Sequence, residues 1–159
     1  MQRTASAARL VRDDMGENLM ERYMIYIPAK GICRLIRCNG AGTLTLNEMQ
    51  ALVDGPIEVT ESFLDTTWAR EPVECIHLIV NEEGLLRQLP DNPHATDLYA
   101  YGDRSGIVGD AVLMAGRGEE LIGFAKPVAK TICSEFELNL LDEDETPAQA
   151  INRFQTFNP

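Results

Sequence analysis

Apolar and polar residues alternate along much of this chain, and the alternation predicts short strands joined by tight turns. Residues 24–29 and 32–38 are rich in β-forming side chains on either side of a glycine turn, so we expect a hairpin. Residues 57–62 alternate regularly and predict a third, half-buried strand, and residues 73–80 predict a fourth. Residues 107–114 are apolar almost throughout, which is typical of a central strand.

Helical patterns occupy fewer places. Thr45-Leu46-Asn47-Glu48 has the form of a capping box, and apolar residues follow it at helical spacing as far as Gly55-Pro56. Residues 94–99 predict a short helical turn inside a loop. A later helix is expected after Pro127, and a last short one after Thr146-Pro147. The apolar stripe of the later helix recurs every four residues: Val128, Ile132, Phe136 and Leu140.

This order of elements favours an α+β fold over a doubly wound parallel one. We expect a small, mostly antiparallel sheet of about five strands, with one helix after the first hairpin and C-terminal helices. Residues 1–23 carry little apolar area and predict a flexible or loosely docked N-terminal extension. Residues 24–141 are expected to form a single α+β domain. Residues 142–159 are expected to be an acidic linker and a short C-terminal helix.

Charge narrows the classes of partner. The formal net charge is −11 and the isoelectric point is about 4.6, which argues against direct binding to nucleic acid. No stretch approaches the roughly 18 apolar residues of a membrane span, so we expect no membrane contact and a cytoplasmic location. The cysteines form no CxxC pair, and we expect reduced, largely buried thiols.

Catalytic and metal-binding patterns are weak. Cys75-x-His77 is the best metal-like pair, but Cys33 and Cys38 are expected on opposite faces of their strand, so we predict no metal and no cofactor. The chain has two histidines and no Gly-x-Ser-x-Gly motif, and Cys133 lies inside a predicted helix. We therefore expect a non-enzymatic protein.

The strongest candidate for a binding surface is the loop from Pro90 to Tyr101, which we expect the turn and loop from Asn81 to Pro93 to position. Asn81 and Gly84 are expected to shape a turn, with Gly84 at positive φ, and the loop after Pro90 carries polar and aromatic side chains over the sheet. Asp110 lies at the start of the fifth predicted strand. The residues predicted to bind a ligand or partner are Asn81, Gly84, Arg87, Asn92, His94, Tyr99, Tyr101, Arg104 and Asp110.

A family resemblance rests on two stretches of this region. Residues 81–93 read Asn-Glu-Glu-Gly-Leu-Leu-Arg-Gln-Leu-Pro-Asp-Asn-Pro, and residues 106–115 form a glycine-flanked apolar strand. Over roughly residues 24–116 the chain resembles the domain of unknown function 3846 family, small proteins common in phages, prophages and plasmids. The resemblance implies an accessory protein of a mobile element, which binds a host protein or a small nucleotide-like ligand and so counteracts a host defence system.

Other interpretations stay open from the residues. An acidic decoy of nucleic acid would carry carboxylates at phosphate-like intervals on one face, and a small hydrolase would need a metal or a nucleophile. We also expect a homodimer, because residues 107–114 and the later helical stripe offer more apolar surface than one thin sheet layer covers.

Overall fold

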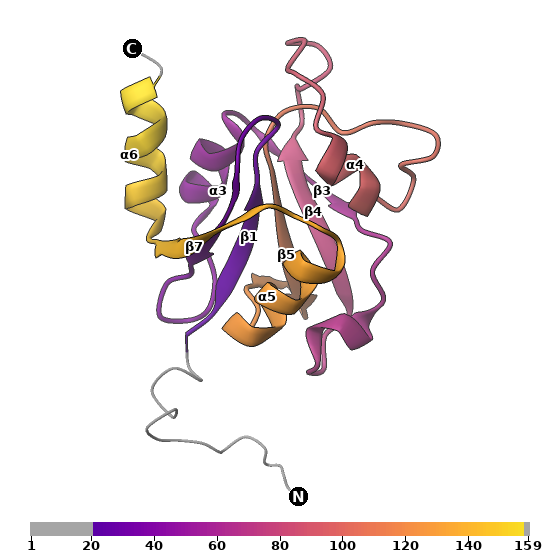
Figure 1. Cartoon of the computed structure of the whole chain (residues 1–159), viewed down its shortest axis with the longest axis vertical. Coiled ribbons are helices and arrows are strands. Elements are labelled where there is room, and N and C mark those ends of the chain that lie inside the picture. The colour runs from indigo at the N-terminus through magenta and orange to yellow at the C-terminus, as the bar shows by residue number, and fades with distance from the viewer. Residues whose placement is uncertain (1–20, 158–159) are drawn as a thin grey trace, which may run out of the picture.

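A computed structural model describes residues 21–157, except for the side chains of residues 142–143 and 154–157. Its strands form one seven-stranded sheet in the order β3-β4-β5-β1-β2-β7, with β6 pairing β5 (Figure 1). The strands are β1 (Tyr23–Ile27), β2 (Cys33–Arg37), β3 (Ile57–Glu61), β4 (Cys75–Asn81), β5 (Ala111–Arg117), β6 (Glu120–Ile122) and β7 (Leu140–Glu145). The predicted α+β class is confirmed, with a larger sheet than the five strands expected.

The sheet is antiparallel apart from one pair of described strands. β1 and β2 form the predicted hairpin, in which Met24 pairs with Ile36. β5 is central: β4 lies along one edge of it, while β1 and then β6 lie along the other. β7 pairs with β2 in parallel, so the C-terminal part of the chain completes a sheet that began near the N-terminus.

Helices cover both faces of the sheet because the central strands are apolar on both faces. Ile25 and Ile27 of β1 face one cluster, which is covered by η1 (Thr66–Ala69), α4 (Pro93–Leu98) and α5 (Lys126–Glu135). Met24 and Tyr26 face the other cluster, which is covered by α3 (Leu46–Val53) and α6 (Pro147–Phe157). In Figure 1, α6 and α4 lie at opposite sides of the sheet.

Local signals place the helix ends correctly in most cases. The capping box of α3 is present, with both the Thr45 and the Glu48 side chains bonded to backbone N–H groups. The helix ends at Asp54, whose φ of 65° is left-handed. α5 is shorter than predicted: it ends at Glu135, Glu137 has φ 56°, and Leu140 belongs to β7. The stripe of four-residue spacing therefore crosses the end of a helix.

The described residues correct the expected boundaries of the domain at both ends. Residues 1–20 of the predicted extension lie outside the description, but Arg22 and Tyr23 belong to the fold. Tyr23 begins β1 with 4% of its surface exposed, and Arg22 Nη2 donates to Glu71 Oε1 at 2.7 Å. The segment expected to be an acidic linker is β7. Its carboxylates are accommodated because basic side chains flank it: Lys126 bonds Asp144 at 2.8 Å.

The central strand is shifted relative to its prediction. β5 begins at Ala111, because Gly109 takes a φ of 79° and Val108 instead pairs with Asp91 in an isolated bridge. β5 ends at Arg117, and Gly118, with a φ of 63°, makes the turn that follows. The chain then returns as β6, a strand that the sequence analysis missed.

The apolar positions on which the expected homodimer rested are covered within one chain. Val128 and Ile132 are 7% and 0% exposed, and Val112 to Met114 of β5 are 0% exposed. Phe136 is partly buried against Trp68, with 5.2 Å between the ring centroids. These residues complete the core of a single chain. Self-association stays a prediction, but an excess of exposed apolar surface at these positions no longer supports it.

Candidate ligand-binding site

A cavity of about 330 Å³ opens where the turn of the β1–β2 hairpin meets the start of β5 and the helix α6. We call it the hairpin cavity. Its walls come from four segments that are distant in the sequence: the hairpin, the Pro90 loop, the start of β5, and α6. The lining residues are Tyr26, Pro28, Ala29, Lys30, Gly31, Ile32, Arg34, Pro90, Asp110 and Arg153.

The inner wall of the cavity is a bonded pair, Tyr26 and Asp110. Tyr26 is 1% exposed, and its hydroxyl donates to Asp110 Oδ2. The other carboxylate oxygen of Asp110 accepts from the backbone N–H of Ala29 at 2.8 Å, which ties the hairpin turn to β5. Burial, then the charge of Asp110 and the hydrogen bond to it, raise the pKa of Tyr26 above its ordinary value of 10.0. The phenol is therefore a fixed donor at neutral pH.

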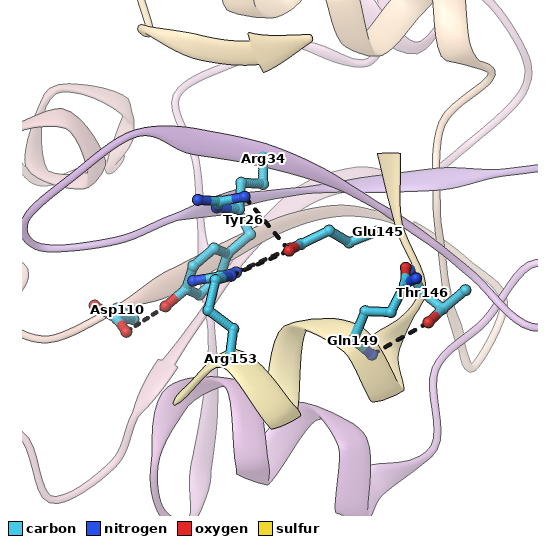
Figure 2. A network of polar contacts seen from close by, with 7 residues as sticks. All are labelled: Tyr26, Arg34, Asp110, Glu145, Thr146, Gln149 and Arg153. Carbon is cyan, nitrogen blue, oxygen red and sulfur yellow. Dashed lines mark hydrogen bonds and ion pairs between the residues drawn. The ribbon is translucent and has the colours of Figure 1, made fainter. Parts of the chain in front are cut away.

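Two arginines share one carboxylate beside this pair. Arg153 of α6 donates from Nε and Nη2 to the two oxygens of Glu145, at 3.1 Å and 2.9 Å. Arg34 Nη1 of β2 reaches Glu145 Oε2 at 3.4 Å. Figure 2 shows both guanidinium groups turned toward Glu145, with the Tyr26 ring between them and Asp110. The Arg153 Cζ lies 5.9 Å from the centroid of that ring, within the range of a cation–π contact.

The cavity is basic in a chain that is strongly acidic. Three cationic side chains line it, Lys30, Arg34 and Arg153, against one lining carboxylate, Asp110. Glu145, which pairs with both arginines, brings the carboxylates to two, and one positive charge remains in excess. The side chains of both arginines are about one-fifth exposed, at 20% and 21%. Lys30 is exposed, and no other described residue forms an ion pair with it. A small anion is therefore the charge type that this cavity favours.

The Pro90 loop holds two walls of the cavity in position. Asn92 is fully buried, and its Nδ2 donates to Ile27 O and Gly109 O, both at 2.9 Å. These two carbonyls belong to the residues just before Pro28 and Asp110, so one side chain holds two walls together. Gly109 is required there, because its φ is 79° and a Cβ would lie 2.8 Å from Leu89 Cδ1.

The start of α6 sets the position of Arg153. Thr146 and Gln149 form a reciprocal capping box: Thr146 N donates to Gln149 Oε1 at 2.9 Å, and Gln149 N donates to Thr146 Oγ1 at 3.2 Å (Figure 2). Ala150, on the same helix, is 0% exposed in the cluster with Met24 and Tyr26. α6 is therefore docked on the sheet, with Arg153 directed at Glu145.

Comparison with protein-family models assigns most of this chain. The model described as "Domain of unknown function (DUF3846)" matches residues 22–137. The chain belongs to the DUF3846 family. No curated protein matches it, and no solved structure matches it.

The DUF3846 match includes most of the hairpin cavity but not all of it. Tyr26, Arg34 and Asp110 lie inside the matched residues. Glu145 and Arg153 lie beyond residue 137, on β7 and α6. The matched region starts with Arg22, next to the first strand, β1, which begins at Tyr23.

The structure places the predicted site residues in three different roles. Asp110 lines the hairpin cavity. Asn92 and Asn81 are buried and structural: Asn81 Nδ2 donates to Val53 O at 2.9 Å and so fastens the end of α3. Gly84 is buried, and it is not at positive φ as expected; Gln88 takes that conformation in this turn, with φ 56°. A Cβ on Gly84 would lie 2.8 Å from Val108 Cγ2, so close packing explains this glycine.

The other predicted residues lie away from the hairpin cavity. Arg87 bonds Asp54 at the end of α3, at 3.0 Å. Tyr99 and Tyr101 pack edge to face, with centroids 5.7 Å apart. His94 is half-buried on α4, and Arg104 is exposed. None of these five side chains lines the hairpin cavity.

Of the lining residues, the sequence analysis predicted only Asp110, and it missed the four others with polar or charged side chains: Tyr26, Lys30, Arg34 and Arg153. Tyr26 and Arg34 sit in predicted strands, and their register within the hairpin puts them opposite each other. That pairing was a signal available in the sequence. Arg153 carried no such signal, because its position depends on the docking of α6.

Other chemistry is limited in the described part of the chain. Residues 21–157 hold no cluster of three or more His, Cys, Asp or Glu that could bind a metal ion. Burial raises the pKa of the Cys33 thiol to about 11, and raises those of Cys38 and Cys133 to about 12, which disfavours thiolate. Among the described helices, none is long and apolar enough to cross a membrane.

Proposed function

We propose that this DUF3846 protein binds a small anionic, nucleotide-like molecule in the hairpin cavity, without transforming it. The observation that carries the proposal is the charge of the cavity: three cations line it in a chain of net charge −11. The negative net charge repels anions from most of the protein surface. A basic cavity in such a protein therefore favours a specific anionic ligand.

The donors of the cavity suit a phosphate or carboxylate group. A guanidinium presents five N–H donors in a planar fork, which matches such anions. Arg34 uses only Nη1 toward Glu145 among the described residues, and Lys30 is an exposed lining residue. Both groups retain donors that can meet an entering anion.

Size and apolar lining narrow the ligand further. About 330 Å³ is at the lower end of the range of small-molecule sites, about 300–1,000 Å³. Pro28, Pro90 and Ile32 add apolar wall next to the cations. A molecule with both a flat apolar part and an anionic part, as in a nucleotide, uses both kinds of surface.

We propose that such binding sequesters a signal molecule. As an accessory protein of a phage, prophage or plasmid in the host cytoplasm, it would hold a nucleotide signal away from the host proteins that respond to it. A protein that sequesters a signal molecule needs affinity and abundance but no catalytic group. The hairpin cavity agrees with this, because the hydroxyl of its tyrosine, Tyr26, stays protonated and acts as a hydrogen-bond donor.

Calorimetric titration with a panel of mononucleotides and cyclic dinucleotides tests the proposal, with adenosine as the uncharged control. We expect at least one nucleotide to bind more than about tenfold tighter than adenosine, a difference of about 1.4 kcal/mol. Arg34→Gln and Lys30→Gln should each remove most of that difference. Arg117→Gln, which removes an arginine paired with Glu71 away from the cavity, should not.

Two results would count against the proposal: no nucleotide binding, or equal binding by Arg34→Gln and Arg117→Gln. Native mass spectrometry of the protein purified from its host provides an independent measurement. It should show a retained small molecule that is released when Arg34 is changed to Gln.

A further inference from the structure

A second surface lies along the outer edge of β3, at the end of the strand order opposite to β7. β3 is at one end of the strand order, so one side of it has no neighbouring strand in the sheet. Two hollows, of about 420 Å³ and 480 Å³, lie next to this edge and share Tyr99 as a common wall. We call this surface the β3 groove.

The backbone of β3 presents unused hydrogen-bonding groups to the groove side. Ser62 N donates inward to Ile76 O, whereas Glu61 O accepts outward from Ala100 N. Because the direction alternates along a strand, the N–H and C=O groups of Ile57 and Val59 also point outward. Residues 98–100 cover the end of this edge near Ser62. Among the described residues, no backbone group forms a hydrogen bond with the outward N–H and C=O groups of Ile57 and Val59.

Exposed apolar side chains gather beside this edge. Leu85 and Leu86 are 74% and 87% exposed and line one hollow, and Phe63 is 51% exposed and lines the other. Tyr101 is 48% exposed and packs on Tyr99. Four of the seven large apolar side chains found exposed in the described residues thus belong to one surface, which is typical of an interaction site.

The charges of the β3 groove are of one sign. The charged residues that line the two hollows are Glu58, Glu82, Asp97 and Asp103, and no lysine, arginine or histidine lines either of them. Arg104 is exposed on the same loop but is not part of either wall. This is the opposite of the hairpin cavity, so the two surfaces select different partners.

We propose that the β3 groove binds an extended, basic segment of a partner protein, which adds to the sheet as a strand beside β3. Main-chain bonds to Ile57 and Val59 provide the register, and alternate side chains enter the hollow lined by Leu85 and Leu86. Lysine or arginine side chains of the segment meet Glu58 and Glu82. A second copy of this chain is disfavoured as the occupant, because it would bring two acidic grooves together on chains of charge −11.

A short fluorescent peptide of alternating lysine and valine is the probe, and anisotropy is the measurement. Two peptides of matched length are the controls: one N-methylated at alternate backbone positions, and one with glutamate in place of lysine. We expect the lysine peptide to bind more than about tenfold tighter than either control, or about 1.4 kcal/mol. Equal binding of the N-methylated peptide would show plain charge attraction and would overturn strand addition.

Variants locate the binding on the protein. Glu58→Lys and Leu86→Ser should each weaken the lysine peptide several-fold, while Leu46→Ser, an exposed leucine on α3, should not. Val59→Pro removes an outward N–H at an edge position where proline is tolerated, and should abolish binding. Hydrogen exchange gives a readout without substitution: the Ile57 and Val59 amides should become protected when the peptide is added. Protection elsewhere, or a dimer that Val59→Pro dissociates, would overturn the proposal.

Discussion

The region matched by the DUF3846 family and the segment that follows it are built in different ways. Residues 22–137 contain β1 to β6 and a core buried on both faces of the sheet. The segment from Leu140 contributes one edge strand, β7, and one helix, α6. It is held by a parallel strand pair, by the ion pairs of Arg34 with Glu145 and of Lys126 with Asp144, and by the packing of Ala150 in the core. The first part has its own core, while the second part depends on the first.

The difference matters for the hairpin cavity because the cavity uses both regions. The matched region supplies the bonded pair Tyr26 and Asp110 and the β2 residue Arg34, while the C-terminal segment supplies Arg153 and its partner Glu145. We therefore expect the wall that carries Arg153 to be less strongly held than the wall that carries Tyr26. A chain with the same matched region and another C-terminal segment would keep the inner wall but change the charge of the cavity.

Alkaline pH should produce the largest effect, and it acts on the matched region. The pKa of Cys38 is raised from its ordinary value of 9.0 to about 12, mainly by burial, and those of Cys33 and Cys133 are raised for the same reason. A raised pKa in the folded state contributes stability that is complete below pH 9 and is lost as the pH rises toward 12. We expect cooperative unfolding in this window, followed by circular dichroism.

The Cys38→Ala variant is the control for the alkaline transition. It lacks one of the buried thiols, so its free energy of unfolding should fall less steeply with pH, although it should be lower at pH 7 because of the lost packing. The C-terminal segment, residues 138–159, contains no cysteine or tyrosine, so it supplies none of the thiol or phenol groups that titrate in this window. A stability that stays level up to pH 11 would contradict the explanation.

Asn92→Ala should be the most damaging single substitution in this comparison. It leaves the carbonyls of Ile27 and Gly109 and the N–H of Ala95 without their partner in a fully buried place. We expect a loss of about 3 kcal/mol in the free energy of unfolding, measured by urea titration. His94→Ala, two residues away and half-buried, is the control and should cost much less. Similar losses for both would mean that the bonds of Asn92 contribute little.

Local signals were easier to read in the sequence than pairings between distant residues. The Thr45 capping box, the hairpin and the start of α6 were predicted because neighbouring residues determine them. β7 was mistaken for a linker because its pairing with β2 joins Cys33 to Leu140, and its acidic residues gain basic neighbours only in the fold. The cavity was missed for the same reason: apart from Asp110, its residues become a group only when four segments meet.

Ala150→Glu should separate the two regions. Ala150 is 0% exposed between α6 and the sheet, so a carboxylate there is buried without a partner unless the helix detaches. We expect a local loss of about 2 kcal/mol, seen as faster hydrogen exchange in α6 with little change at Leu113 of β5. Gln149→Glu, an exposed change on the same helix, is the charge-matched control. Equal loss of protection at Leu113 would show that the two regions unfold as one unit.

The two capping boxes give the smallest and most direct comparison, because the same device occurs once in each region. Thr45→Ala removes the cap of α3, and Thr146→Ala removes that of α6. Each should cost about 1 kcal/mol. For Thr45 the cost should appear in the global free energy of unfolding, since Leu52 and Val53 of α3 belong to the core. For Thr146 it should appear as faster local exchange at Ala150 and Ile151, with the global value nearly unchanged.

Thr131→Ala, inside α5, is the control and should change either quantity by less than about 0.5 kcal/mol. If Thr146→Ala lowers the global stability as much as Thr45→Ala does, then α6 is part of the cooperative core and Arg153 is held as firmly as Tyr26.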